Sequence, residues 1–191
     1  MSMVHATQPQ HPATNGQTIK TRRLVLRPQQ LSDAGSIAEA LSDFQVARML
    51  RRIPAPYHRQ DALEWLIMRT VGTAPGWDFA ITCADDTLIG VVSVEKRDGE
   101  WQLGYWLNPA HWGKGYMTEA ASAVTERFFQ HMPDETLYSG VFADNAASLR
   151  VQDKLGFRVI GCHEIYATSR STMVTHIDTA VTARTFRSSR A

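Results

Sequence analysis

The segment between residues 101 and 132 constrains the fold more than any other part of the chain, because its hydrophobic period changes part-way along it. In Trp101–Leu107 the residues Trp101, Leu103, Tyr105 and Leu107 alternate with Gln102, Gly104 and Trp106, which predicts a β-strand that ends at Asn108-Pro109. From Met117 onward, apolar residues recur at the spacing of an amphipathic helix. Gly113 and Gly115 lie between the two and let the backbone turn sharply. A strand, a glycine loop and a helix are therefore expected in direct succession.

Such a connection favours an anion-binding site, because it gathers unpaired N–H groups at the positive end of a helix dipole. Taken alone, the loop is equally explained as a plain strand-to-helix turn whose glycines meet only a backbone requirement. A nucleotide phosphate-binding loop needs about four residues between its glycines, followed by Lys-Ser/Thr. The sequence Gly113–Thr118 has neither feature, which disfavours a nucleotide-phosphate enzyme.

Alternation and capping residues predict the order β–α–α–β–β–β–α–β–α–β–β along the chain. Strands are expected at Arg23–Arg27, Trp77–Cys83, Leu88–Lys96, Trp101–Leu107 and Thr136–Phe142, and within Phe157–Tyr166 and Met173–Phe186. Helices are expected after a cap at Ser32 or Asp33, over Asp61–Val71, from Met117, and over Asn145–Leu155, which the Asn145 side chain should cap. The segment Phe44–Arg59 is read as irregular and basic, with no carboxylate between Asp43 and Asp61.

Three segments carry a family resemblance: GYWLNPAHWGKGYMTEA from residue 104, NAASLRVQDKLGF from residue 145, and TRRLVLRPQQLSD from residue 21. Together, and because they follow one another along the chain in the family's order, they resemble the GNAT superfamily of N-acetyltransferases, in particular the ribosomal-protein N-acetyltransferase (RimJ/RimL-type) branch. The resemblance covers roughly residues 18 to 186. It implies a single α/β (α+β) domain, here 18–187, after a polar tail, 1–17, that we expect to be disordered.

The resemblance also implies the architecture. We expect a mixed, mostly antiparallel sheet of about six to seven strands with helices on both faces. Two central strands splay apart in this family, and the pantetheine arm of the cofactor lies in the gap. Here those strands would be Trp101–Leu107 and Thr136–Phe142.

The implied co-substrate is acetyl-CoA, without a metal ion. The residues expected to bind it are Leu107, Trp112, Gly113, Lys114, Gly115, Tyr116, Met117, Thr118, Asn145 and Ser148. Backbone N–H groups of the glycine loop would hold the pyrophosphate. Lys114 is equally explained as a solvated loop residue. Relatives usually carry Arg or Gln where this chain has Ala110, so no side-chain contribution is expected there.

Acetyl transfer needs a stabilised oxyanion, a protonated leaving group and an amine that loses its proton. In the ribosomal-protein branch, the serine at the position of Ser148 is credited as the acid, and we expect Ser148 to act as acid or oxyanion donor. On the helix, Gln152 should share the face of Ser148, whereas Ala147, Val151 and Leu155 should face the core. Gln102 stands where close relatives carry Glu; it cannot be a base, but it can orient a water or the amine. Glu100 and His111 are weaker candidates, and the sequence offers no convincing base.

The expected function is therefore acetyl-CoA-dependent N-acetyl transfer to a primary amine, by direct attack in a ternary complex. The amine is either a protein N-terminus or an amino-acid-like small molecule, because the basic segment Phe44–Arg59 would repel a polyamine if it faces the acceptor. The alternative is a non-catalytic acyl-CoA-binding module or regulator. Gln102 and Gln152 suggest it, because neither amide can act as a base or release a proton. The sequence leaves monomer and homodimer both open.

Composition limits the other function classes. The 191 residues carry a net charge of +1, which gives no field that points to nucleic acid or membrane. Cys83 and Cys162 form neither a disulfide framework nor a metal-binding spacing, and neither pairs with a histidine as a hydrolase nucleophile would. A cytoplasmic location is expected.

Overall fold

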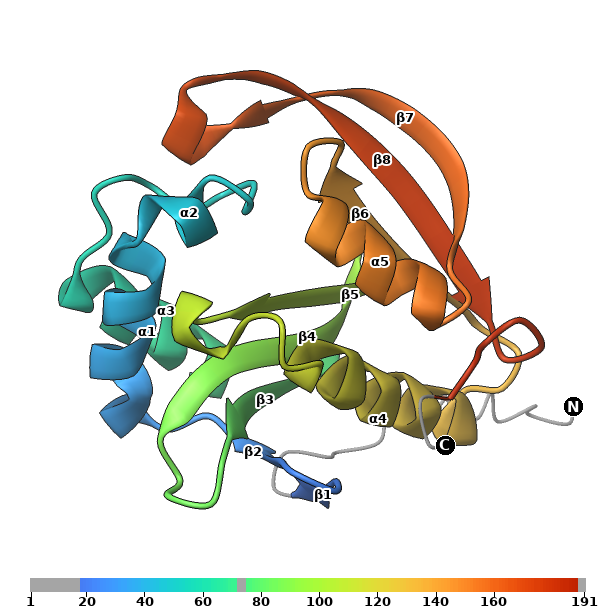
Figure 1. Cartoon of the computed structure of the whole chain (residues 1–191), viewed down its shortest axis with the longest axis horizontal. Coiled ribbons are helices and arrows are strands. Elements are labelled where there is room, and N and C mark those ends of the chain that lie inside the picture. The colour runs from blue at the N-terminus through green and yellow to red at the C-terminus, as the bar shows by residue number, and fades with distance from the viewer. Residues whose placement is uncertain (1–17, 72–74, 189–191) are drawn as a thin grey trace, which may run out of the picture.

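The computed structural model describes residues 18–71 and 75–188, so the predicted tail lies outside the described part of the chain. Within this part, eight strands form one sheet in the order β1-β2-β3-β4-β5-β6-β8-β7 (Figure 1). Every neighbouring pair is antiparallel except β5 and β6, which run parallel. The predicted mixed, mostly antiparallel domain is confirmed. One strand is added to the seven expected, because β1 (Ile19–Lys20) is too short for its alternation to be read.

The elements follow the predicted order with small shifts of their ends. The longer strands are β2 (Val25–Pro28), β3 (Gly76–Thr82), β4 (Leu88–Arg97), β5 (Glu100–Leu107), β6 (Thr136–Phe142), β7 (Arg158–Ala167) and β8 (Thr172–Thr182). The helices are α1 (Ala34–Ser42), α2 (Phe44–Ala47), α3 (Arg59–Val71), α4 (Tyr116–His131) and α5 (Ala146–Lys154). Three 3-10 turns complete the set: η1 (Leu31–Asp33), η2 (Pro109–His111) and η3 (Thr168–Arg170).

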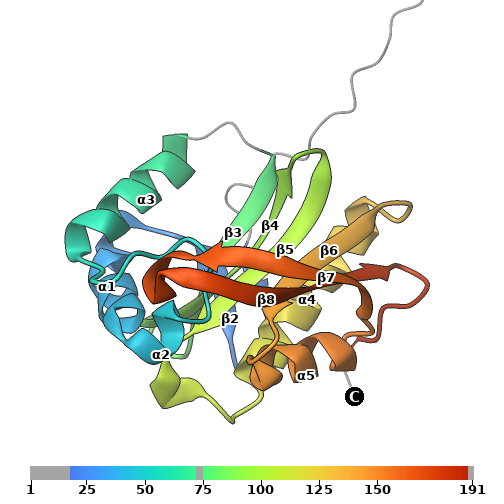
Figure 2. The same ribbon diagram turned by 90° about the horizontal axis from the view of Figure 1, so that it is seen from above.

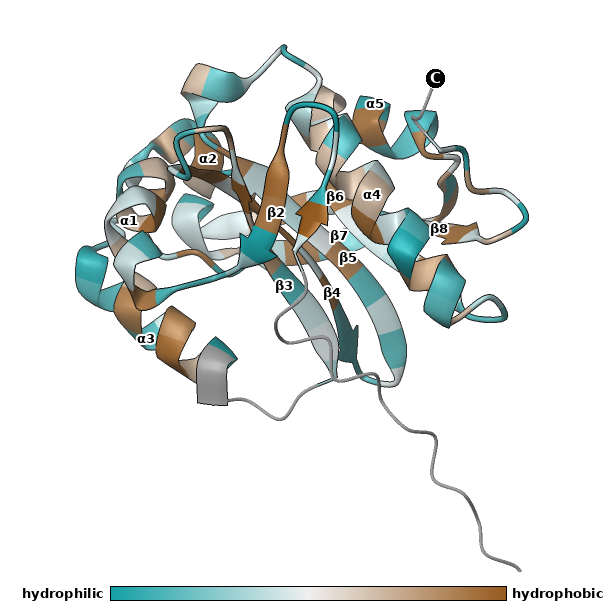
Figure 3. Ribbon diagram, turned by 90° about the horizontal axis from the view of Figure 1, so that it is seen from below, coloured by the Kyte–Doolittle hydropathy of each residue, from teal (hydrophilic) through white to brown (hydrophobic). Residues whose placement is uncertain are grey.

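Helices cover both faces of the sheet, as predicted (Figure 2). On one face α1 and α3 pack against β3 and β4 through Ile37, Leu41, Leu66, Ala80 and Val91. On the other, α4 packs against β2 to β5 through Met117, Val124 and Phe128, together with Leu155 of α5. Figure 3 shows apolar segments along the central strands beneath these helices. No helix within residues 18–71 and 75–188 is long and apolar enough to cross a membrane.

Three local predictions need correction. Pro28 does not end its strand but forms part of it, paired with Phe79; β1 pairs only with the start of β2, so no neighbour requires the missing N–H there. The segment predicted to be irregular contains α2, which the Asp43 side chain caps. Asp33 is the N-cap residue of α1, but its side chain makes no capping hydrogen bond; its carboxylate instead accepts hydrogen bonds from the Arg27 side chain.

The strands β5 and β6 splay apart, as expected. They pair at two positions only, Trp101 with Leu137 and Gln102 with Tyr138. Beyond them, the Ser139 hydroxyl donates to the Leu103 carbonyl at 2.9 Å. Each strand then stays with its antiparallel neighbour, β5 with β4 and β6 with β8. The divergence opens the sheet at its centre, and the functional site lies there.

Candidate active site

The glycine loop has the geometry that its sequence predicts. Gly113 and Gly115 have φ of +74° and +76°, in the left-handed region where a side chain is strained. Gly115 is the N-cap residue of α4. The first N–H groups of that helix have no partner within it, so they remain available to an anion at the positive end of the helix dipole.

An ion pair on the outside of the loop holds it in place. The Arg23 guanidinium donates to the Lys114 carbonyl at 2.9 Å and to Glu119 at 2.7 Å, and it lies over the Tyr116 ring. Thr21 donates to the same carboxylate at 2.7 Å. Burial raises the pKa of Glu119, but the hydrogen bonds from Thr21 and Arg23 outweigh it and hold that pKa below its usual value. The N-terminal segment from residue 21, which carries part of the family resemblance, therefore stabilises the glycine loop.

The loop also closes on itself. The Trp112 indole N–H donates to the Leu107 carbonyl at 2.7 Å, and the Asn108 side chain accepts from the Ala110 N–H. Lys114 Nζ donates to the Ala110 carbonyl at 3.0 Å. This contact favours the interpretation of Lys114 as a loop residue rather than as a charge directed at the cofactor.

A cavity of about 820 Å³ lies between the splayed strands and the glycine loop. Most of the predicted cofactor residues line it: Leu107, Trp112, Gly113, Gly115, Tyr116, Met117, Thr118, Asn145 and Ser148. Lys114 and Gln102 are not among its lining residues. The cavity is also bordered by the segment that follows α2 and, from β8, by His176.

The central polar pair of the cavity is Tyr105 of β5 and Ser148 of α5. Their hydroxyl oxygens lie 2.8 Å apart. The Asn145 side chain accepts from the Ser148 N–H at 3.1 Å and so caps α5, as predicted. Burial raises the pKa of Tyr105 to about 12, so the phenol keeps its proton through the neutral range. The sequence pattern assigned no role to Tyr105, whose one signal was a hydroxyl within an otherwise apolar strand face.

Gln152 does not share the cavity with Ser148, and this prediction was wrong. Its side chain is buried, donates to the Ser139 hydroxyl at 3.1 Å and accepts from the Thr179 hydroxyl at 2.9 Å. Ala147 and Val151, which we placed toward the core, instead line the cavity. The core-facing side of α5 is therefore centred between Gln152 and Leu155, because the two hydrogen bonds allow the amide to be buried.

Gln102 occupies the last paired position of β5 and β6, opposite Tyr138. Its amide donates to the Glu100 carboxylate at 3.2 Å. The strands have not yet separated at this register, which explains why Gln102 lies outside the cavity. Of the two residues predicted to be catalytic, Ser148 alone borders the cavity.

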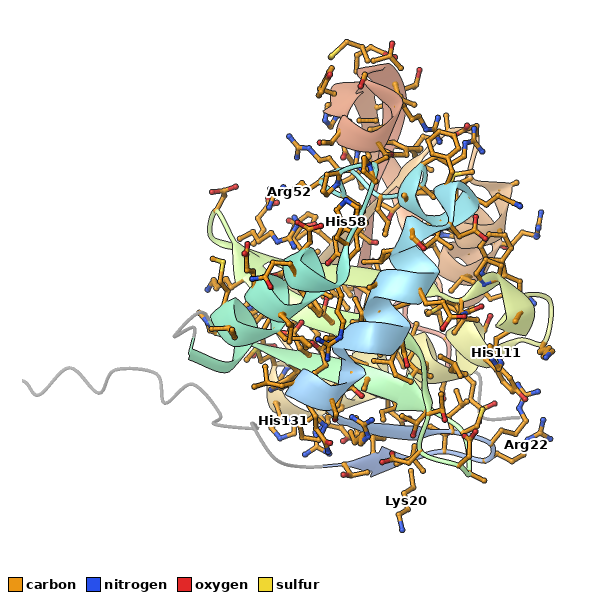
Figure 4. The ribbon with its side chains drawn as sticks, turned by 90° about the vertical axis from the view of Figure 1, so that its left-hand side faces the viewer. Lys20, Arg22, Arg52, His58, His111 and His131 are labelled. Carbon is orange, nitrogen blue, oxygen red and sulfur yellow. The ribbon has the colours of Figure 1, made fainter. Side chains whose placement is uncertain are left out.

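The basic segment meets the cavity through part of its length. Arg48 and Arg51 line it. Arg48 and Arg170 both pair with Asp144, at 2.8 and 2.9 Å, and the bonds from Arg170 lower the pKa of that carboxyl. Arg51 has no such ion pair among the described residues. Arg52 is exposed outside the cavity lining, on the α3 side of the molecule near His58 (Figure 4).

The tip of the β7–β8 hairpin contacts this segment. Ser169 donates to the Ala47 carbonyl at 2.9 Å, and the Thr168 N–H donates to the Arg51 carbonyl at 3.0 Å. Figure 1 shows the hairpin arching over β6 and α5 toward α2. The cavity thus has a glycine-loop end and, across the gap between the strands, an end formed by α2 and β8.

The family is decided by a match of residues 23–158 to the model of the acetyltransferase (GNAT) domain. The chain belongs to the GNAT family. It is 29% identical over 142 residues to an uncharacterized N-acetyltransferase, YnaD, of Bacillus subtilis, which covers 73% of this chain and 82% of that protein. The chain is thus an acetyl-transferring enzyme of GNAT fold.

Two solved structures show the likeness to the ribosomal-protein branch at the level of the fold. The ribosomal-protein-S5-alanine acetyltransferase of Vibrio fischeri has a TM-score of 0.72 and 19% identity, over 89% of this chain and 98% of that one. RimJ of Mycobacterium smegmatis, solved with CoA-disulfide, has a TM-score of 0.70 and 18% identity, over 84% and 82%.

Proposed function

We propose that the protein transfers the acetyl group of acetyl-CoA to an α-amine, at a peptide N-terminus or on an amino-acid-like small molecule, by direct attack in a ternary complex. One observation carries the proposal: the glycine loop, the Tyr105–Ser148 pair and the Arg51 guanidinium border a single cavity. A donor held at the loop and an acceptor near Arg51 would therefore meet without a covalent enzyme intermediate.

At the donor end, the N-terminus of α4 would take the pyrophosphate through backbone N–H groups. Arg150 and Lys154 of α5 line the same cavity and supply positive charge for the remaining phosphate of the cofactor. Sequence reasoning did not single out these two residues, because charges on the outer side of a helix are usually solvated.

At the centre, acetyl transfer develops negative charge first on the carbonyl oxygen and then on sulfur. Tyr105 stays protonated at neutral pH and bonds Ser148, so the pair offers a preorganised donor to that charge. Because Gln152 is held in the core, Ser148 and Tyr105 carry the hydroxyl groups at the centre of the cavity that the reacting thioester would contact.

At the acceptor end, Arg51 would favour a carboxylate close to the amine and disfavour a polyamine. An α-amine has a pKa of roughly 7.7–8.0, so a useful fraction is neutral near pH 7. The Vibrio fischeri structural neighbour is named for acting on an alanine of ribosomal protein S5, which agrees with an α-amine acceptor.

The test measures kcat/KM by release of free CoA, with an acidic N-terminal peptide, a free amino acid and spermidine side by side. We expect the α-amines to exceed spermidine, and Arg51→Glu to reduce that preference. Arg52→Glu is the matched control, since it makes the same charge change outside the cavity lining. A higher kcat/KM for spermidine would refute the acceptor class. Acetyl-CoA binding without CoA release for any of these three amines would refute the proposed acceptors as a whole.

A further inference from the structure

His176 of β8 borders the same cavity as Arg51, and it belongs neither to the glycine loop nor to the Tyr105–Ser148 pair. Its ring lies directly against Gly140 of β6, where an added Cβ would come within 2.1 Å of His176 Cε1 and 2.4 Å of Nε2. The chain therefore leaves room for an imidazole at this place. The same side chain is among the residues that line the cavity.

The neighbours of His176 orient its ring. Its Nδ1 lies 3.1 Å from Asp178 Oδ1, and the other oxygen of that carboxylate bonds Nδ1 of His163 at 2.9 Å. An ionised carboxylate only accepts hydrogen bonds, so Nδ1 of His176 must be the donor. In the neutral ring, the free lone pair is then on Nε2, the atom beside Gly140.

Strand alternation places His176 across the gap from Ser148. Ser139 of β6 bonds Gln152 of α5, so the odd-numbered residues of this part of β6 face α5. Gly140 faces the opposite way, and the His176 ring lies on that side. The Tyr105–Ser148 pair and His176 thus border one cavity from opposite faces of the sheet.

Burial favours the neutral form of the His176 ring, and the surrounding charged groups act in both directions. Burial lowers the pKa of His176 most; Asp178 opposes this, and His163 of β7 and Arg51 of the segment after α2 add to the lowering. A histidine that is neutral near pH 7 is able to accept a proton.

We propose that His176 is the general base that takes the proton from the acceptor amine, with Asp178 as its positioning residue. The inference rests on the proposed function and supplies the base that the sequence did not offer. The amine nitrogen forms a bond to the thioester carbon while Nε2 accepts one N–H proton. The C–S bond then breaks with its electron pair on sulfur, and the CoA thiolate takes its proton from the Tyr105–Ser148 pair. His176 afterwards passes its proton to water, and the Tyr105–Ser148 pair regains a proton from water, so that no net proton is gained or lost.

The test compares His176→Gln with His163→Gln, which removes the other histidine bound to Asp178 but lies outside the cavity lining. We expect His176→Gln to lower kcat/KM by about 10²-fold and to remove the wild-type rise in kcat/KM with pH through the pKa of the base. His163→Gln should stay within a few-fold. The acetyl-CoA-induced shift in Tm, measured for each variant, should equal that of wild type.

The imidazole-sized space left by His176→Ala provides a second readout. Added free imidazole should restore part of the lost rate in His176→Ala and none in Ser148→Ala. The proposal is overturned if His176→Gln keeps wild-type turnover and pH profile, if it loses the acetyl-CoA shift in Tm, or if imidazole fails to rescue. The proposed function fails separately, if the wild-type protein itself releases no CoA.

Discussion

Replacing Gln152 by alanine should reduce stability while leaving chemistry almost intact. The side chain is 2% exposed and links α5 to β6 and β8 through Ser139 and Thr179. Two lost hydrogen bonds account for about 1–3 kcal/mol. The Ser139 and Thr179 hydroxyls keep their bonds to the carbonyls of Leu103 and Ser139, so neither donor is left unsatisfied. The space left by the truncated side chain brings the expected loss to about 2–4 kcal/mol.

Urea unfolding followed by circular dichroism measures the loss in free energy of unfolding. In a thermal unfolding experiment, the same loss should lower Tm by about 5–15 °C. Gln152→Met keeps the volume and removes only the hydrogen bonds, so it should lose less than Gln152→Ala. Turnover per folded molecule should remain within a few-fold of wild type for both variants. A loss below about 1 kcal/mol, or a kcat defect as large as that of a Ser148 variant, would refute the assignment of Gln152 to the core.

Three further outcomes follow from the site. Acetyl-CoA at 100 times its dissociation constant should stabilise the wild-type protein by roughly 2.7 kcal/mol, and Gly115→Val should abolish this stabilisation because a β-branched residue is strained at φ +76°. Thermal unfolding with and without acetyl-CoA measures the effect. An unchanged shift in Tm for the variant would show that the loop is not part of the site. Ser148→Ala should lower kcat, measured by CoA release, about 10²-fold, with little change in the acetyl-CoA affinity measured by titration. Near wild-type turnover in this variant would show that Ser148 is not a catalytic residue. The pKa of Glu119 is held below 4.5 in the folded state. The ionised carboxylate therefore contributes to the free energy of unfolding above pH 4.5, and this contribution is lost as the pH falls through the pKa of the folded state. Urea unfolding from about pH 7 to about pH 3 should therefore show the stability gap between wild type and Glu119→Gln narrowing at acid pH, whereas a gap independent of pH would contradict the ion pair with Arg23.

The sequence by itself determined the local elements and the glycine loop that borders the cavity. The change of period between Trp101 and Met132 located β5, the loop and α4, because apolar spacing and glycine conformation depend only on neighbouring residues. The cap at Asn145 was predicted for the same reason. The catalytic role of Ser148 was predicted only with the help of the family resemblance, and the structure places Ser148 at the cavity.

Only the tertiary structure decided which side chains share the cavity. Gln152 and Ser148 lie on neighbouring helical positions, yet the hydroxyls of Ser139 and Thr179, from two other strands, bury one of them. Gln102 falls outside the cavity because β5 and β6 separate one residue beyond it. Tyr105 and His176 enter it through a strand divergence and a hairpin that join residues far apart in the chain. Such contacts depend on how strands pair and diverge, and no periodicity within a single segment encodes them.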